Sequence, residues 1–224
     1  MKVEELNEHY PFLYHMAETG TWAAIKRHGL LSTSALLDLF EIHGDRRRLI
    51  EAERRPQSIP ITHPKHGSAI IRDQKPMNET ALLKCLQDGI TPSQWYQILN
   101  KRVFFWLSRE RLDRLLSARA YKNKQHCVLT LKTEELLSNH AAEVTLSPIN
   151  SGATLYTPQP RGKDTFLRIK DYPFDTWLDK RGIENAVVEL VVDYAVPDAH
   201  EYVLRVDERQ AEKNIEHIFV RNNS

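Results

Sequence analysis

The chain carries, from residue 185 to residue 192, the run Asn185-Ala186-Val187-Val188-Glu189-Leu190-Val191-Val192. Because β-branched residues favour strands, the run predicts a strand, and alternation along it puts Glu189 on the same face as Val187 and Val191. A carboxylate on such a face is hard to bury unless it is paired, hydrogen-bonded or held for chemistry. The other interpretation is an edge strand or open sheet face that leaves Glu189 in water. The run alone leaves both open.

The composition indicates one globular domain. The 224 residues are 41% hydrophobic and 27% charged, which is enough to build one core over residues 1–224. No stretch reaches the roughly 20 apolar residues that span a bilayer, and residues 1–5 lack the apolar segment of a signal peptide. We therefore expect a cytoplasmic protein with no membrane partner. Cys85 and Cys127 fall in segments with helix and strand patterns, which predicts reduced thiols and no disulfide.

The formal net charge is +1, so no global field draws the chain to nucleic acid. Residues 101–124 are locally basic, with eight Lys and Arg residues against Glu110 and Asp113. Such a cluster can contact phosphates, although a solvated helix face is the commoner explanation. The basic residues are Lys101, Arg102, Arg109, Arg111, Arg114, Arg119, Lys122 and Lys124.

Strands and capped helices alternate along the sequence, which predicts the α+β class. After a strand at 12–16 we expect a helix that ends at Gly29, and then a helix capped by Ser34 that runs through Phe40. Residues 43–67 are a polar insertion, predicted as a charged helix followed by a mobile loop. Further strands are expected at 68–73, 103–107, 127–131, 144–146, 187–192 and 201–206, and further helices after Asn78, Thr91-Pro92, Ser108 and Thr133.

Several common catalytic motifs do not occur. The sequence has no P-loop, no glycine-rich dinucleotide fingerprint and no Gly-x-Ser-x-Gly elbow. The run His63-Pro64-Lys65-His66 comes closest to a metal motif, but its proline interrupts helical presentation, so we predict a surface loop and no metal site. His126 and Cys127 are neighbours on a strand and point to opposite faces, so they cannot form a nucleophilic pair.

Three strand segments in a fixed order carry the remaining functional signal. They are residues 13–18 with His15, residues 103–107 with Phe105 and Trp106, and residues 187–191 with Glu189. This order resembles the three-motif signature of ADP-ribosyltransferases. Tyr14-His15-Met16 and the later run from Lys26 to Ser32 are similar to the opening of the DarT group of bacterial DNA-modifying ADP-ribosyltransferases. Residues 72–77 and 147–152 resemble segments of an uncharacterised bacterial family related to that group.

The resemblance implies a fold, an activity and a set of site residues. The implied fold is α+β, with the split mixed β-sheets of ADP-ribosyltransferases and flanking helices. The implied activity is NAD-dependent transfer of ADP-ribose, with NAD as the substrate, as in a toxin-like enzyme. A carboxylate beside the ribose can stabilise the positive charge that develops when the nicotinamide bond breaks. The implied catalytic residues are Glu189 and His15, and the residues implied around NAD are His15, Ser32, Thr33, Phe105 and Trp106. We add Arg72 to the catalytic residues on its own chemistry, because it lies in a strand-like run and its planar guanidinium suits the diphosphate.

The resemblance also places His15 and Glu189 on adjacent central strands, with side chains that face the same side and converge on one cleft. Taken singly, His15 and the aromatic residues are ordinary core residues, and Arg72 is a partner for Asp73 or another acid. The long polar insertion between Leu31 and Val103 departs from the DNA-modifying enzymes, so the acceptor is left open among DNA, RNA, protein, a small molecule and water.

Two non-catalytic alternatives remain. One is a module of the same fold that binds a nucleotide or nucleic acid through the basic residues 101–124. The other is an antitoxin-like interaction protein that uses the helix expected at 45–55.

Overall fold

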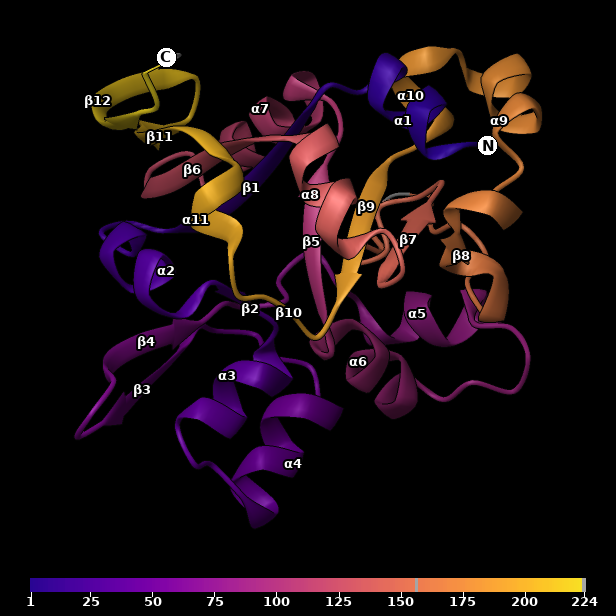
Figure 1. Ribbon diagram of the computed structural model, residues 1–224. Coiled ribbons are helices and arrows are strands. Elements are labelled where there is room, and N and C mark those ends of the chain that lie inside the picture. The colour runs from indigo at the N-terminus through magenta and orange to yellow at the C-terminus, as the bar shows by residue number, and fades with distance from the viewer. Residues whose placement is uncertain (156, 223–224) are drawn as a thin grey trace.

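The computed structural model describes residues 1–155 and 157–222, and an eight-stranded sheet is its largest element (Figure 1). The strand order is β12-β11-β6-β1-β5-β9-β7-β8, and each neighbouring pair is antiparallel. The α+β class is therefore as predicted, but the expectation of mixed sheets is wrong for these strands. The bounds are β1 (Phe12–Glu18), β5 (Arg102–Trp106), β6 (Gln125–Lys132), β7 (Val144–Ser147), β8 (Leu167–Arg168), β9 (Glu189–Asp193), β11 (Val203–Gln210) and β12 (Lys213–Val220).

The sheet is nearly divided in its middle. Strands β1 and β5 pair only at Tyr14 and Trp106, whereas β1 pairs with β6 along its whole length and β5 with β9 from Arg102 to Trp106. The sheet thus consists of two four-stranded halves joined at one residue pair. Beyond Tyr14, strand β1 has a hydrogen-bonded neighbour on one side only, which leaves its other edge available to line a cavity.

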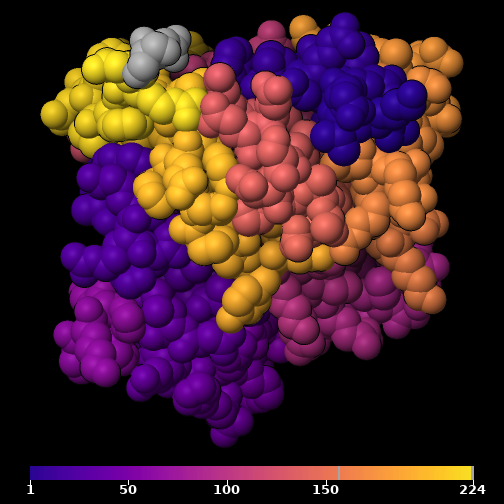
Figure 2. Space-filling model, in the orientation of Figure 1, coloured from indigo at the N-terminus to yellow at the C-terminus, as the bar shows by residue number. Residues whose placement is uncertain are grey.

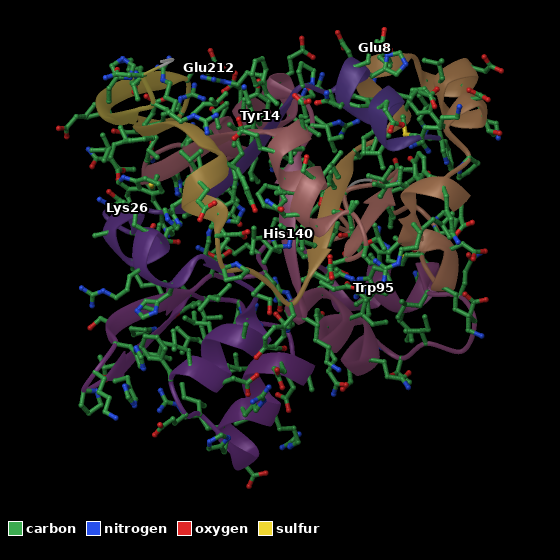
Figure 3. The ribbon with its side chains drawn as sticks, viewed as in Figure 1. Glu8, Tyr14, Lys26, Trp95, His140 and Glu212 are labelled. Atoms are coloured by element: carbon green, nitrogen blue, oxygen red, sulfur yellow. The ribbon has the colours of Figure 1, made fainter. Side chains whose placement is uncertain are left out.

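Helices cover both faces of the sheet. The largest cluster of buried side chains lies between one face and helices α1 (Val3–His9), α2 (Trp22–His28), α8 (Thr133–His140) and α11 (Ala199–Tyr202). Figure 2 shows α8 in salmon over the middle of this face, between α1 in indigo and the yellow-orange C-terminal segment. On the other face, α5 (Glu79–Cys85) and α6 (Pro92–Asn100) pack around Trp95 (Figure 3), and α7 (Arg109–Ser117) packs on Met16 and Val128.

Among the described residues, a side-chain cap marks the start of three helices. The side chains of Asn78 and Thr91 cap α5 and α6 as predicted, the first accepting from Ala81 N and the second from Gln94 N. Helix α3 (Thr33–Leu39) is capped by Ser32, which accepts from Ala35 N, so the prediction of Ser34 as the cap is wrong. Gly29 ends α2 with φ of 76°, as expected for the C-terminal residue of a helix.

The polar insertion is more ordered in structure than its sequence suggests. Helix α4 (Gly44–Ala52) forms as predicted, but the expected mobile loop is instead the hairpin of β3 (Ile59–His63) and β4 (Gly67–Ile71). Ile61 and Ile71 are buried against Leu37 and Ile50 of α3 and α4. The alternation of apolar residues needed for this packing is present, but Pro60 and the histidines obscure it.

Two further differences from the predicted elements concern the start of β9 and strand β12. Residues 183–186 form the short helix α10 (Ile183–Ala186), so strand β9 begins only at Glu189. Strand β12, which lies at the sheet edge and is mostly exposed, had no clear alternation and was not predicted. The short strands β2 (Leu30–Leu31) and β10 (Ala195–Val196) pair with each other, and α9 (Phe174–Arg181) covers the region near Trp177. No helix among the described residues is long and apolar enough to cross a membrane.

Candidate functional site

A cavity of about 440 Å³ lies where β1 and β5 separate. Its wall includes residues 15–18 of β1 and all of β5, together with the loop at residues 150–152 and the end of β4. This volume is within the range of pockets that bind small molecules. All seven residues predicted from the sequence to form the site line it, namely His15, Ser32, Thr33, Arg72, Phe105, Trp106 and Glu189.

Glu189 is a buried carboxylate on a central strand. Its side chain is 4% exposed, and β9 lies between β5 and β7, so the interpretation as a solvated edge residue is wrong. The backbone N–H of Ser151 donates to both carboxylate oxygens at 3.2 Å. Burial raises the pKa of Glu189 to about 7, against the opposing effects of Ser151, Arg161 and Arg111. The carboxyl group can therefore be either a proton donor or an anion near neutral pH.

The loop that holds Glu189 is fixed by Arg161, which sequence reasoning missed. Arg161 is 1% exposed, and its guanidinium donates to the carbonyls of Ser151 at 2.9 Å, Ala153 at 3.0 Å and Gln159 at 3.1 Å. The guanidinium also lies 5.9 Å from the ring centroid of Trp95. The only sequence signal for this loop was the run at 147–152, and nothing linked that run to Arg161.

His15 is held in one tautomer at the cavity wall. Its Nδ1 lies 2.9 Å from the carbonyl oxygen of Phe104, and burial lowers the pKa of His15 to about 4. At neutral pH the ring is therefore uncharged, and Nδ1 must carry the proton because a carbonyl can only accept. Nε2 is then an acceptor that suits a ligand hydroxyl group.

His15 and Glu189 line the same cavity, but two of our expectations about them are wrong. Strand β5 lies between β1 and β9, so the two residues are not on adjacent strands. Tyr14, Trp106 and Glu189 are in register across the three strands and share one sheet face. His15 follows Tyr14 and so belongs to the opposite face, with Phe105 at a ring distance of 5.6 Å. The two side chains meet the same cavity because the sheet is open between β1 and β5.

The two aromatic candidates differ in their surroundings. Phe105 is 1% exposed and belongs to the main core, although it also borders the cavity. Trp106 is half-buried and stands directly beside Glu189 in the β5–β9 register. Of the two, Trp106 is the better placed to contact a ligand ring next to the carboxylate.

Arg72 pairs with an acid, as expected for an ordinary arginine, and that acid is Glu18 and not Asp73. Its Nε lies 3.3 Å from the Glu18 carboxylate, and Nη1 donates to the carbonyl of Met16 at 3.0 Å. Asp73, the suggested partner, instead accepts from the hydroxyl of Tyr121 at 3.1 Å. Both pairs lie at the cavity wall.

Ser32 and Thr33 stand at the start of α3. The Ser32 hydroxyl is 2% exposed and is used as the helix cap, which leaves it less free for a ligand. Thr33 follows it at the cavity wall.

The basic residues at 101–124 are not one continuous helix face, because α7 ends at Ser117. Arg109 pairs with Asp113 at 3.3 Å, and Arg111 is half-buried and bonded to Asn185. The basic residues of this cluster with exposed side chains in or after α7 are Arg109, Arg114, Arg119, Lys122 and Lys124.

The run at residues 63–66 comes closest to a metal motif, and its two histidines pack against each other. The rings of His63 and His66 stack with centroids 4.8 Å apart in the hairpin of β3 and β4. Within residues 1–155 and 157–222, no group of three or more metal-ligating side chains is arranged to hold a metal ion.

The raised pKa of Glu189 predicts a pH-dependent stability. The pKa of Glu189 is about 7 in the folded protein, above its ordinary value of 4.5. The contribution of the Glu189 carboxyl group to the stability of the fold is therefore fully present below pH 4.5, and it is lost as pH rises through about 7. The contribution is about 3 kcal/mol. Glu189→Gln lacks this ionisation, so it should unfold at higher urea concentration than the wild type at pH 8 but not at pH 4.5. An equal difference in urea midpoint between Glu189→Gln and the wild type at pH 4.5 and at pH 8 would contradict the raised pKa.

The fold and the cavity define an α+β protein in which a buried carboxylate on a central strand borders a cavity of ligand size. The sequence model of a family of unknown function, DUF7002, matches residues 11–203, and the chain belongs to this family. No curated protein and no solved structure matches the chain.

Proposed function

We propose that this protein cleaves the nicotinamide bond of NAD and transfers ADP-ribose to a macromolecular acceptor. The observation that carries the proposal is that seven residues from five separate segments all line one cavity, six of them chosen by their resemblance to NAD-binding motifs and Arg72 for its guanidinium. Such a convergence is not expected if the seven were unrelated core residues.

The chemistry available in the cavity fits this reaction. The developing charge on the nicotinamide ribose is positive, and a carboxylate in a dry site stabilises such a charge more strongly than one in water. Glu189 is buried and oriented by Ser151, so it needs little rearrangement during the reaction. In this proposal His15 accepts a ribose hydroxyl at Nε2, and Trp106 stacks near the nicotinamide.

The test is incubation of the protein with NAD that is labelled separately in nicotinamide and in adenine, together with mixed nucleic acid and protein. Release of nicotinamide shows cleavage, and the molecule that gains the adenine label identifies the acceptor. Free labelled ADP-ribose alone would indicate hydrolysis.

The alternative is a non-catalytic module that binds a nucleotide in the same cavity. It is favoured by one observation, since both oxygens of Glu189 already accept from Ser151 N and the side chain is 4% exposed. A module of this kind would bind NAD without releasing nicotinamide.

The exposed basic residues predict how a nucleic-acid acceptor would bind. Replacing Arg114 and Lys122 by Gln should reduce the slope of log affinity against log salt by about 1.4 to 1.8 units for an oligonucleotide, because each lost phosphate contact removes released counterions. Fluorescence anisotropy over a salt series measures the slope, and hydrolysis of NAD without acceptor should not change. An unchanged slope would assign these residues to a solvated surface and favour a protein or small-molecule acceptor.

A further inference from the structure

Arg55 is a buried cation that forms no ion pair within the part of the chain that the structure describes. Its side chain lies at the cavity wall, and the residue is 6% exposed. Nε donates to the carbonyl of Arg72 at 3.1 Å, Nη1 to the carbonyl of Ile50, and Nη2 to the side-chain oxygen of Asn100 at 2.9 Å. Among the described residues, no carboxylate oxygen lies within 4.0 Å of this guanidinium.

The other arginines that line the cavity differ in this respect. Arg72 pairs with Glu18 at 3.3 Å, and Arg102 pairs with Asp193 at 3.2 Å. A buried charge without a counter-charge is costly, and neutral hydrogen-bond acceptors offset only part of that cost. Burial lowers the pKa of Arg55 to about 10, so the group is still a cation at neutral pH. Asp73, also at the cavity wall, favours the charged form of Arg55 through space but forms no ion pair with it, so an anion in the cavity would supply the direct counter-charge that Arg55 lacks.

The hydrogen bonds of Arg55 leave donors for such an anion. A guanidinium has five N–H donors, and the three bonds to Arg72, Ile50 and Asn100 use one on each nitrogen. One N–H on each terminal nitrogen is left over. Two donors on a planar fork suit the oxygens of a phosphate better than a single point charge does.

We propose that Arg55 anchors an anion subsite in this cavity that binds the diphosphate of a nucleotide. Asn100 holds the guanidinium in place from α6. The inference deepens the proposed function and rests on it for the identity of the ligand as NAD, but the subsite itself requires only a diphosphate. It also moves the diphosphate contact from Arg72, whose charge Glu18 already balances, to Arg55.

Asn100→Asp is the sharpest test, because it brings a carboxylate to the atom that already accepts from Arg55. The variant supplies a counter-charge from within the protein and keeps the size of the side chain, but it loses the hydrogen bond from Asn100 Nδ2 to the carbonyl of Glu51 at 2.8 Å, so unchanged adenosine affinity is the check that the cavity is intact. We expect the wild type to bind ADP at least tenfold more tightly than adenosine in titration calorimetry. In the variant, the affinity for ADP should fall about tenfold or more, in line with the loss of a charge-assisted contact, and the affinity for adenosine should not change.

Arg102→Gln is the matched control, since Arg102 lines the same cavity but is balanced by Asp193, and it should keep the preference for ADP. If Asn100→Asp does not fold, Arg55→Lys serves in its place, because it keeps the charge but loses the fork, and it should lower the affinity for ADP several-fold. A wild type without preference for ADP, or an Asn100→Asp protein that binds ADP as the wild type does, would overturn the subsite.

The two proposals fail in different ways. ADP preference that depends on Asn100, without nicotinamide release from NAD, would refute the enzyme and keep the subsite. Nicotinamide release by the wild type, together with an Asn100→Asp protein that still prefers ADP, would keep the enzyme and refute the subsite.

Discussion

Glu189→Gln should lower the rate of nicotinamide release from NAD by about 10² to 10³-fold and leave NAD affinity nearly unchanged. The substitution keeps the volume of the side chain but removes the negative charge, and loss of one such electrostatic group raises the barrier by about 2.7 to 4 kcal/mol. Glutamine can still accept from Ser151 N, which donates to both oxygens of Glu189 in the wild type. The local fold should therefore persist.

The measurement is single-turnover release of labelled nicotinamide with saturating protein, together with calorimetric titration of NAD. Glu208→Gln is the matched control. Glu208 is also a buried carboxylate, and it accepts from Gly20 N at 2.9 Å, but it is not among the residues that line the cavity. Equal rates for the wild type and Glu189→Gln would show that Glu189 has only a structural role.

Arg161→Met should reduce both stability and activity. The side chain of methionine can fill part of the space against Trp95, but the carbonyls of Ala153 and Gln159 lose the donor that Arg161 supplies, and the carbonyl of Ser151 keeps only Trp95 Nε1 at 3.4 Å. Hydrogen bonds to charged groups contribute roughly 1.5 to 3 kcal/mol each, so we expect unfolding free energy to fall by about 4 kcal/mol or more. This is a large share of the total stability of a typical protein.

The same variant should shift the pH dependence of nicotinamide release. Arg161 lowers the pKa of Glu189, so without Arg161 the carboxyl group ionises only at a higher pH. The rising limb of the pH–rate profile should therefore move to higher pH. Arg168→Met is a suitable comparison, because Arg168 also donates to carbonyls but is exposed, and its loss should change stability by about 0.5 kcal/mol or less. Loss of stability with no shift in the pH–rate profile would show that Arg161 supports the fold without affecting the ionisation of Glu189.

The strands and helix starts near the site could be predicted because their signals are local. The valines around Glu189, the aromatic run of β5 and the caps at Asn78 and Thr91 all depend on neighbouring residues. The burial of Glu189 was one of two interpretations, and the structure selects it by placing β9 between β5 and β7.

The arrangement of the site could not be predicted from local patterns. Arg161 and Arg55 both depend on partners far away in the sequence, such as Trp95 and Asn100. The separation of β1 from β5 after one residue pair also has no local signal, and it is this separation that lets His15 reach a cavity bordered by Glu189 on the other face.

Release of nicotinamide from NAD by the wild-type protein tests the central claim most directly. The proposal predicts nicotinamide release that requires protein, rises with pH through about 7 as Glu189 ionises, and transfers the adenine label to a macromolecular acceptor. Binding of NAD by calorimetry without release of nicotinamide at any pH from 6 to 9, with all acceptor classes present, would contradict it and leave a nucleotide-binding module.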